Sequence, residues 1–342
     1  MSIKLSENHE PSQAGGDTDS GAVRDSNLTE MVKRKALELG FDRVGIAPVQ
    51  PSAFKREYRN WIAGGYAADM EYLKNNIERR FDPSLLLAEA KSIISIMLNY
   101  YTGPDEADPP ADRAVFARYA RGADYHRVME KRLKALAQYL ADHAGEPIQS
   151  RVYVDTGPIL EREVAQRAGL GWFGKNTMLI NTRLGSYFLL GEVITTAALV
   201  PDRPAVGGCG TCTKCLDACP TGALIVPYQL DSRRCISYLT IEHHGPIPEP
   251  YHRAIGNHVF GCDICQEVCP FNSRRASPTA DPEMQPRESV KNRTLEDIAS
   301  LSEDQYREEF KQSAVKRAKR QGLKRNALIG LKHLTGSSPD GR

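Results

Sequence analysis

The spacing of the cysteines constrains this chain more than any other feature of its sequence. All eight cysteines lie between Cys209 and Cys269, and four of them follow the pattern C-x2-C-x2-C-x3-C-P in CGTCTKCLDACP. This spacing is typical of bacterial ferredoxins, in which three cysteines ligate one [4Fe–4S] cluster and the fourth ligates a second cluster. The sequence therefore predicts two neighbouring iron–sulfur clusters.

A second, partial copy of the pattern supplies the remaining ligands. It reads CDICQEVCP, and the position where a full copy would begin holds Val259, which cannot ligate iron. Cys235 lies alone between the two copies and can provide the missing thiolate. We expect cluster 1 to be held by Cys209, Cys212, Cys215 and Cys269, and cluster 2 by Cys219, Cys235, Cys262 and Cys265.

Zinc and disulfides are the alternatives for these thiols. Cysteines with two residues between them also bind zinc, but two C-x3-C-P endings with crossed ligation favour iron–sulfur clusters. The N-terminus lacks the apolar stretch of a signal peptide, and no run approaches the roughly 18 apolar residues of a membrane span. We therefore expect a cytoplasmic protein without a membrane segment, in which thiols stay reduced. The net charge of +2 excludes a wholly basic nucleic-acid coat.

The hydrophobic pattern predicts an α+β fold. Residues 1–27 are polar and are expected to form a disordered tail. Helical periodicity in residues 28–39 and strand-like runs at 41–49, 92–100, 151–155 and 186–200 interleave over residues 28–202, which favours one mixed domain. Asp124 can cap a long amphipathic helix. A ferredoxin-like domain is expected over residues 203–280 and a short, basic helical region over residues 281–342.

One carboxylate in the first domain could act as an acid. Asp155 stands at the end of a predicted strand, before a Thr-Gly-Pro turn. The position suits an exposed acid in a cleft, although the residues alone favour a turn-forming Asp that bonds its own backbone. The glycines of GLGWFG (residues 169–174) match a dinucleotide-binding pattern, but a helix precedes them where that motif requires a strand, so we do not predict such a site.

Seven separate stretches in one order resemble the epoxyqueuosine reductase family. The resemblance runs from about residue 28 to residue 331 and rests on ARYARGADYH, VDTGPILERE, AGLGWFGKNTMLI, CGTCTKCLDACPTGAL, ISYLTIEHHGPIP, GNHVFGCDICQEVCPFN and AVKRAKRQGLKRNA.

This resemblance implies an oxidoreductase that carries out the last step of queuosine formation in tRNA. It implies a cobalamin bound between the first domain and the cluster domain, and reduction of the epoxide of epoxyqueuosine to an alkene with loss of water. Two clusters can deliver the two electrons singly, and an external donor of the flavodoxin or ferredoxin type is expected to supply them. Asp155 matches the family's proton donor, for which burial near the corrin should raise the pKa.

Further positions match cofactor contacts. The resemblance implies that Asp155 also touches cobalamin, together with Arg118, Asn176, Met178, Ser237 and Asp263. Asp124-Tyr125-His126 begins the D-x-H-x-x-G pattern of cobalt-ligating histidines, but Met129 occupies the glycine position. We therefore do not assign His126 as a cobalt ligand and expect it to line the cleft.

A basic stretch near the C-terminus is the candidate tRNA contact. It contains no acidic residue. A run of charges usually forms only a solvated surface, but a polyanionic substrate favours the interpretation that this stretch contacts phosphates. The segment between the cluster ligands that contains HHG could contact the anticodon loop. The predicted tRNA-binding residues are His243, His244, Lys316, Arg317, Lys319, Arg320, Lys324 and Arg325.

Two other functions use similar parts. A reductive dehalogenase combines the same cofactors, but such proteins usually carry a twin-arginine export signal, which this sequence lacks. An electron-transfer subunit would need neither the large first domain nor Asp155. Because no segment resembles a dedicated interface, we expect a monomer.

Overall fold

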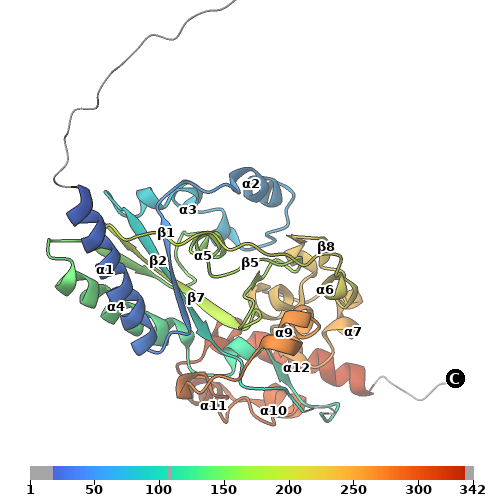
Figure 1. Cartoon of the computed structure of the whole chain (residues 1–342). Coiled ribbons are helices and arrows are strands. Elements are labelled where there is room, and N and C mark those ends of the chain that lie inside the picture. The colour runs from blue at the N-terminus through green and yellow to red at the C-terminus, as the bar shows by residue number, and fades with distance from the viewer. Residues whose placement is uncertain (1–17, 107–108, 336–342) are drawn as a thin grey trace, which may run out of the picture.

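The computed structural model describes residues 18–106 and 109–335 (Figure 1). The α-helices are α1 (Thr18–Glu38), α2 (Lys55–Ala63), α3 (Ile77–Phe81), α4 (Tyr125–His143), α5 (Glu161–Arg167), α6 (Lys214–Asp217), α7 (His252–Ile255), α8 (Ile264–Glu267), α9 (Pro270–Arg275), α10 (Leu295–Ser300), α11 (Glu303–Glu309) and α12 (Lys319–Thr335). The strands are β1 (Arg43–Pro48), β2 (Ser92–Asn99), β3 (Val115–Phe116), β4 (Ser150–Tyr153), β5 (Trp172–Phe173), β6 (Leu179–Ile180), β7 (Phe188–Thr195), β8 (Leu224–Val226), β9 (Gln229–Leu230) and β10 (His258–Phe260).

A four-stranded antiparallel sheet organises the first part of the chain. Its strand order is β1-β2-β7-β4, and every residue of β2 is buried. Ile94 and Ile96 face a core that α1 and α4 complete, whereas Ile93 and Met97 face a core that α5 completes. Because side chains alternate along a strand, helices on both faces account for the continuously apolar sequence of β2.

The predicted strands and the capped helix are present, which confirms the α+β class. The expected runs at 41–49, 92–100, 151–155 and 186–200 contain β1, β2, β4 and β7, and their pairing is antiparallel throughout. The Asp124 side chain accepts a hydrogen bond from the His126 backbone N–H, so it caps α4 as expected. Gly40 has φ +86°, the left-handed conformation that favours glycine where a helix ends.

The disordered tail expected over residues 1–27 falls mostly outside the described residues. Residues 1–17 lie outside the described part of the chain, and α1 already begins at Thr18. Polar composition suggested disorder up to residue 27, but the amphipathic pattern of residues 28–39 belongs to a helix that extends further back. Within the described residues, no helix has both the length and the apolar character needed to cross a membrane.

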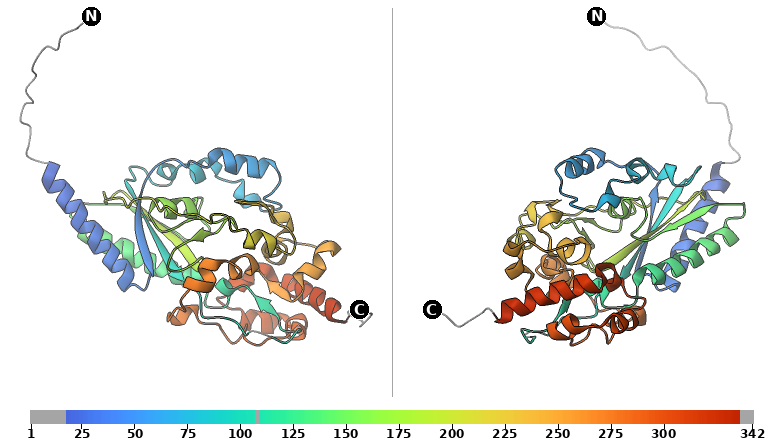
Figure 2. Two further views of the ribbon diagram at one scale, coloured as in Figure 1. Left: turned by 45° about the vertical axis from the view of Figure 1, so that its right-hand side comes forward. Right: turned by 180° about the vertical axis from the view of Figure 1, so that it is seen from behind.

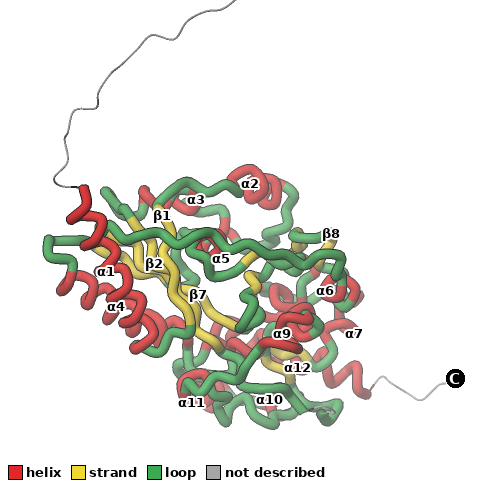
Figure 3. Tube along the Cα trace, viewed as in Figure 1, coloured by secondary structure: helices red, strands yellow, loops and turns green. Residues whose placement is uncertain are grey.

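The cysteine-rich segment consists of short elements joined by loops (Figure 3). The short helices α6 and α8 contact each other, and β8 forms a hairpin with β9. Strand β10 pairs in parallel with β3, which precedes α4 in the chain. This pairing ties the cysteine segment to the first part of the molecule.

The C-terminal helices pack on the cysteine segment (Figure 2). Helix α12 contacts α7, α10 and β10, and Phe116, Phe260 and Phe310 lie together in one buried core. A Cβ at Gly330 of α12 would lie 2.8 Å from the Gly256 carbonyl oxygen, so the close approach of this helix requires glycine. The region therefore shares its core with β3 and β10.

Candidate active site and iron–sulfur centres

The four thiols predicted to hold cluster 1 lie around one cavity. Cys209, Cys212, Cys215 and Cys269 line a cavity of about 40 Å³, together with Lys175 and other residues. The Lys175 ammonium donates hydrogen bonds to the Gly210 and Cys212 carbonyl oxygens, at 2.7 and 2.9 Å. This lysine therefore fixes the loop that carries the first two cysteines.

The thiols predicted to hold cluster 2 act on one another through their charges, and Cys235 and Cys262 pack against the same apolar cluster. Burial, aided by the neighbouring Cys235 and Cys219 charges, raises the pKa of Cys262 to about 12. Burial likewise raises the pKa of Cys265, with Cys235 and Cys262 adding to the shift. All eight cysteines are free thiols. Since cluster ligands must be thiolates, iron binding has to displace protons from these buried groups.

Hydrogen bonds to sulfur prepare one cysteine for ligation. Burial raises the pKa of Cys219, but the Thr221 hydroxyl and nearby backbone N–H groups outweigh it and lower the pKa overall. The Ala223 N–H donates to the Cys219 sulfur at 3.2 Å. Such donors stabilise the thiolate over the thiol.

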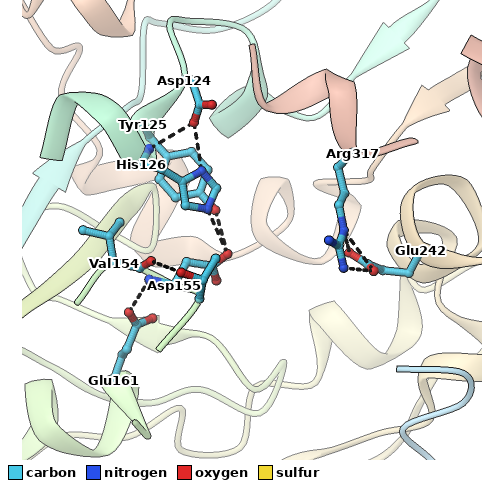
Figure 4. Close-up of polar contacts among 9 residues, drawn as sticks. Asp124, Tyr125, His126, Val154, Asp155, Glu161, Glu242 and Arg317 are labelled. Carbon is cyan, nitrogen blue, oxygen red and sulfur yellow. Dashed lines mark hydrogen bonds and ion pairs between the residues drawn. The ribbon is translucent and has the colours of Figure 1, made fainter. Parts of the chain in front are cut away.

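Asp155 lies at the centre of a polar network at the end of β4 (Figure 4). Its carboxylate accepts a hydrogen bond from the Tyr125 hydroxyl at 3.0 Å, and its Oδ2 lies 3.3 Å from Nε2 of His126. His126 Nδ1 lies 2.8 Å from Asp124 Oδ1. The cap of α4 thus positions both aromatic partners of Asp155, whose side chain is 58% exposed.

The charges in this network shift the pKa values of both His126 and Asp155. Burial opposes the charged imidazolium, but hydrogen bonds with Asp124 and Asp155 outweigh it and raise the pKa of His126 to about 9. The surrounding protein removes part of the water around the half-exposed Asp155 carboxyl and raises its pKa, yet the His126 hydrogen bond and charge together with Tyr125 lower it below its ordinary value. The expected rise in the pKa of Asp155 depends on burial near the corrin and stays a prediction, whereas in this arrangement the cationic partner His126 lowers that pKa.

Arg118 and Asp263, both predicted cobalamin contacts, join the cysteine segment to the first part of the chain. The Arg118 backbone N–H donates to Asp263 Oδ2 at 2.7 Å, and burial raises the pKa of this carboxyl to about 6. The Arg118 guanidinium donates to the Gly103 carbonyl oxygen and pairs with Asp105, each at 2.8 Å. These contacts hold the start of α8 in place.

Asn176, Met178 and Ser237 lie beside the same segment. The Asn176 amide donates to the Cys265 carbonyl oxygen and accepts from the Met178 backbone N–H, both at 3.2 Å. The Ser237 hydroxyl lies 3.5 Å from the Cys262 carbonyl oxygen. The predicted cobalamin contacts thus gather where the cluster ligands meet the rest of the chain, and their contact with a cofactor stays a prediction.

Arg317 lies across the site from Asp155 (Figure 4). Its guanidinium forms a two-pronged ion pair with Glu242, with Nε–Oε1 at 3.0 Å and Nη2–Oε2 at 2.7 Å. It also lies 5.5 Å from the centre of the Tyr72 ring. The charge of Arg317 helps to lower the pKa of Asp155, so this arginine borders the same site.

The predicted basic face divides into residues with different contacts. A turn over Ala314–Ala318 precedes α12, whose first residue, Lys319, has φ +57°. The Arg325 guanidinium donates to the carbonyl oxygens of Leu239, His243 and Gly245 at 2.7 to 2.8 Å. Arg325 therefore anchors the predicted HHG loop through its backbone, a role that the sequence pattern did not indicate.

The remaining predicted tRNA contacts differ in how freely they can reach a ligand. Arg320 pairs with Glu303 at 2.9 Å, and His243 lies 3.4 Å from Asp69. His244 and three lysines are exposed. These lysines are Lys316, Lys319 and Lys324. The structure leaves RNA contact by all of these residues as a prediction.

Sequence reasoning missed three acids near the site. Glu161 accepts a hydrogen bond from the Asp155 backbone N–H at 2.6 Å. Glu192 is fully buried in β7, and Glu242 pairs with Arg317. A glutamate inside the otherwise apolar run of 186–200 was the one visible signal, because buried acids are rare without a partner.

Two ferredoxin-type cysteine groups, joined to an antiparallel sheet that presents an exposed acid, define an iron–sulfur oxidoreductase. Residues 208–272 match the family described as a 4Fe-4S double cluster binding domain, and residues 80–156 match the family described as epoxyqueuosine reductase QueG. The chain belongs to the epoxyqueuosine reductase family, as its relatives show.

Curated relatives and solved structures support this membership over most of the chain. Epoxyqueuosine reductase of Pseudomonas aeruginosa is 40% identical over 321 residues, covering 92% of this chain and 88% of the relative. That of Synechocystis sp. is 44% identical over 292 residues, covering 84% and 100%. A solved epoxyqueuosine reductase with an epoxyqueuosine-modified tRNA-Tyr stem loop has a TM-score of 0.85 and 35% identity, covering 91% of this chain and 82% of that chain. The Streptococcus thermophilus structure has a TM-score of 0.81 and 32% identity, covering 90% and 82%.

Proposed function

We propose that this chain reduces epoxyqueuosine to queuosine in the anticodon loop of tRNA. The observation that carries the proposal is a match over most of the chain to epoxyqueuosine reductases, at about 40% identity, together with the double-cluster domain. A similar structure is solved with an epoxyqueuosine-modified tRNA stem loop. A base in such a loop can enter a pocket without disruption of a duplex.

The cofactors of the proposed reaction are two [4Fe–4S] clusters and cobalamin. When bound, cobalamin supplies a strongly reduced cobalt that can attack or donate electrons to the strained epoxide. The residues that would hold it are Arg118, Asp155, Asn176, Met178, Ser237 and Asp263. The fit rests on the open carboxylate of Asp155, and on His126, whose two ring nitrogens already face Asp124 and Asp155. This imidazole is thus engaged by protein rather than free to ligate cobalt.

Asp155 is the proposed proton donor to the departing epoxide oxygen. Conversion of the epoxide to an alkene and water consumes two electrons and two protons. At neutral pH a proton resides on His126, because its pKa is about 9 and that of Asp155 is lowered. Asp155 Oδ2 lies 3.3 Å from this imidazole. Asp155 can therefore take a proton from His126 and pass it to the departing oxygen, and solvent supplies the second proton.

The remaining partners follow from the same chemistry. An external carrier of the flavodoxin or ferredoxin type would supply single electrons to the clusters. The exposed lysines Lys316, Lys319 and Lys324 would contact RNA phosphates, while Arg317 and Arg320 would have to exchange their acidic partners for RNA. We propose that the enzyme acts as a monomer in the cytoplasm, where its cysteines stay reduced.

Nucleoside mass analysis tests the proposed function directly. Transfer RNA bearing epoxyqueuosine is incubated without oxygen with the reconstituted protein and a strong reductant, with and without cobalamin. We expect the modified nucleoside to lose the mass of one oxygen only when cobalamin is present. No loss in either sample, with both clusters verified as intact, would favour a dehalogenase-like enzyme or an electron carrier.

A further inference from the structure

A buried carboxyl lies in the central part of the sheet, beneath the Asp155 loop. Glu192 of β7 is 0% exposed. It pairs across the sheet with Ser95 of β2 on one side and with Tyr153 of β4 on the other. Its strand neighbour Ile194, two residues on, belongs to the apolar core that α5 covers. Since side chains two residues apart share a face, Glu192 points into that apolar layer.

The groups of the described residues that act on Glu192 include no cation. They are the carboxyl of Glu161 from α5 and the hydroxyl of Ser95 from β2. Within the described residues, neither carboxyl oxygen of Glu192 has a hydrogen-bond partner, counted with Glu192 as a carboxylate. Arg162, which follows Glu161 in α5, directs its guanidinium to the Thr177 carbonyl oxygen instead. A buried carboxyl without a cation favours its neutral form, which can donate a hydrogen bond.

Glu161 connects this buried acid to the catalytic loop. Its Oε1 accepts the Asp155 backbone N–H at 2.6 Å, and its charge interacts with that of Glu192. Burial and the nearby Asp155 charge raise the pKa of Glu161 to about 7, and burial raises that of Glu192 well above its usual range. Two acids that interact so closely avoid carrying two charges together.

The loop itself needs such support. Asp155 has φ +57°, a left-handed conformation that is uncommon for any residue other than glycine. Its backbone N–H would turn toward water if the loop relaxed, and its carboxylate would then leave Tyr125 and His126. The contact with Glu161 thus couples the backbone of Asp155 to the interior of the sheet.

We propose that Glu161 and Glu192 form a positioning pair, in which the neutral Glu192 donates to Glu161 and Glu161 holds the Asp155 backbone N–H. The inference rests on the proposed role of Asp155 as proton donor. Glu161 acts on the reaction through Asp155 and does not touch the substrate. The pair therefore governs where the Asp155 carboxyl points, whereas Tyr125 and His126 govern its charge.

Hydrogen exchange of the loop separates this role from general stability. Exchange of the peptide spanning residues 154–160 is followed by mass spectrometry in the full chain with its clusters reconstituted. We expect at least ten-fold faster exchange in Glu161→Ala and in Glu192→Ala. Glu163→Ala is the matched control, because Glu163 lies in the same helix and holds the Ala53 backbone N–H at 2.8 Å instead. It should leave exchange of residues 154–160 unchanged.

Conservative variants and the pH profile complete the test. Glu192→Gln keeps a neutral donor of nearly the same shape, so it should retain slow exchange where Glu192→Ala does not. In the natural chain, ionisation of both Glu161 and Glu192 at high pH should accelerate exchange of residues 154–160. Glu192→Gln should lack this acceleration. Unchanged exchange in both alanine variants, or equal acceleration in Glu163→Ala, would overturn the proposal. Because exchange is measured without turnover, this result is independent of whether Asp155 proves to be the proton donor.

Discussion

Asp155 Oδ2 and His126 Nε2 lie 3.3 Å apart, and the other ring nitrogen of His126 lies 2.8 Å from Asp124. The histidine is therefore held between two acids, one of which caps the helix that carries it. This relationship sets the protonation of the site. It also connects the loop after β4, which carries Asp155, to the first turn of α4.

Substitution of Asp155 should remove turnover and leave binding intact. Asp155→Asn keeps the size of the side chain and its contact with Tyr125, but it cannot donate a carboxyl proton. We expect a loss of about 100-fold or more in the single-turnover rate, with normal iron content and tRNA affinity. Asp155→Ala should behave in the same way. Full activity in either variant would exclude Asp155 from proton transfer.

His126 should control how the activity depends on pH. Because the pKa of His126 is about 9, this histidine loses its proton as the pH rises through that value and can no longer supply Asp155. Turnover by the natural chain should therefore fall on the alkaline side near pH 9. In His126→Gln this limb should disappear and the rate below pH 8 should be lower. An alkaline limb that persists unchanged in His126→Gln would assign it to another group.

The same histidine should contribute to stability in a defined pH range. Its folded pKa of about 9 exceeds the ordinary value of 6.5, so the folded protein holds the proton more tightly than the unfolded chain does. The stabilisation is complete below pH 6.5 and is lost as the pH rises through about 9. Denaturant unfolding from pH 6 to 10 should show a smaller loss of stability in His126→Gln. Equal curves for both proteins would contradict the ion pairs of His126.

The sequence predicted the local elements well and their contacts less well. The alternating and continuous apolar runs were sufficient to predict β1, β2, β4 and β7, because the burial of a strand determines the polarity pattern of its own residues. Cysteine spacing predicted which thiols would come together around the cluster 1 cavity, since a short helical turn brings two cysteines with two residues between them close in space. The contact between Asp155 and His126 joins positions far apart in the chain, and no local pattern encodes their distance. For the same reason the sequence did not reveal the structural role of Arg325. Its charge suggested a contact with RNA, whereas its guanidinium donates hydrogen bonds to backbone carbonyl oxygens.

Loss of Cys235 should remove one cluster and spare the other. Cys235 is the lone cysteine between the two repeats, and its charge acts on Cys262. In Cys235→Ser, we expect iron per chain to fall from about eight to about four atoms, as one [4Fe–4S] cluster is lost. An unchanged iron content in Cys235→Ser would disprove the predicted division of ligands.

Exposed lysines near α12 should control tRNA affinity through charge. Lys316, Lys319 and Lys324 are exposed. The combined change of these three residues to Glu should weaken binding of a tRNA anticodon stem loop by at least ten-fold at low salt. It should also reduce the dependence of affinity on salt, because fewer phosphate counterions are released. The same change of Lys91, Lys131 and Lys134, which are also exposed and lie outside the predicted tRNA contacts, provides the charge-matched control.

Arg325→Ala should weaken the same binding for a different reason. The guanidinium holds the loop of His243 and Gly245 by backbone hydrogen bonds, so its loss should loosen the loop without removing a phosphate contact. We therefore expect reduced affinity with an unchanged salt dependence, and faster hydrogen exchange over residues 239–246. Weakened binding whose salt dependence also falls, with normal exchange of the loop, would instead place Arg325 against the RNA backbone.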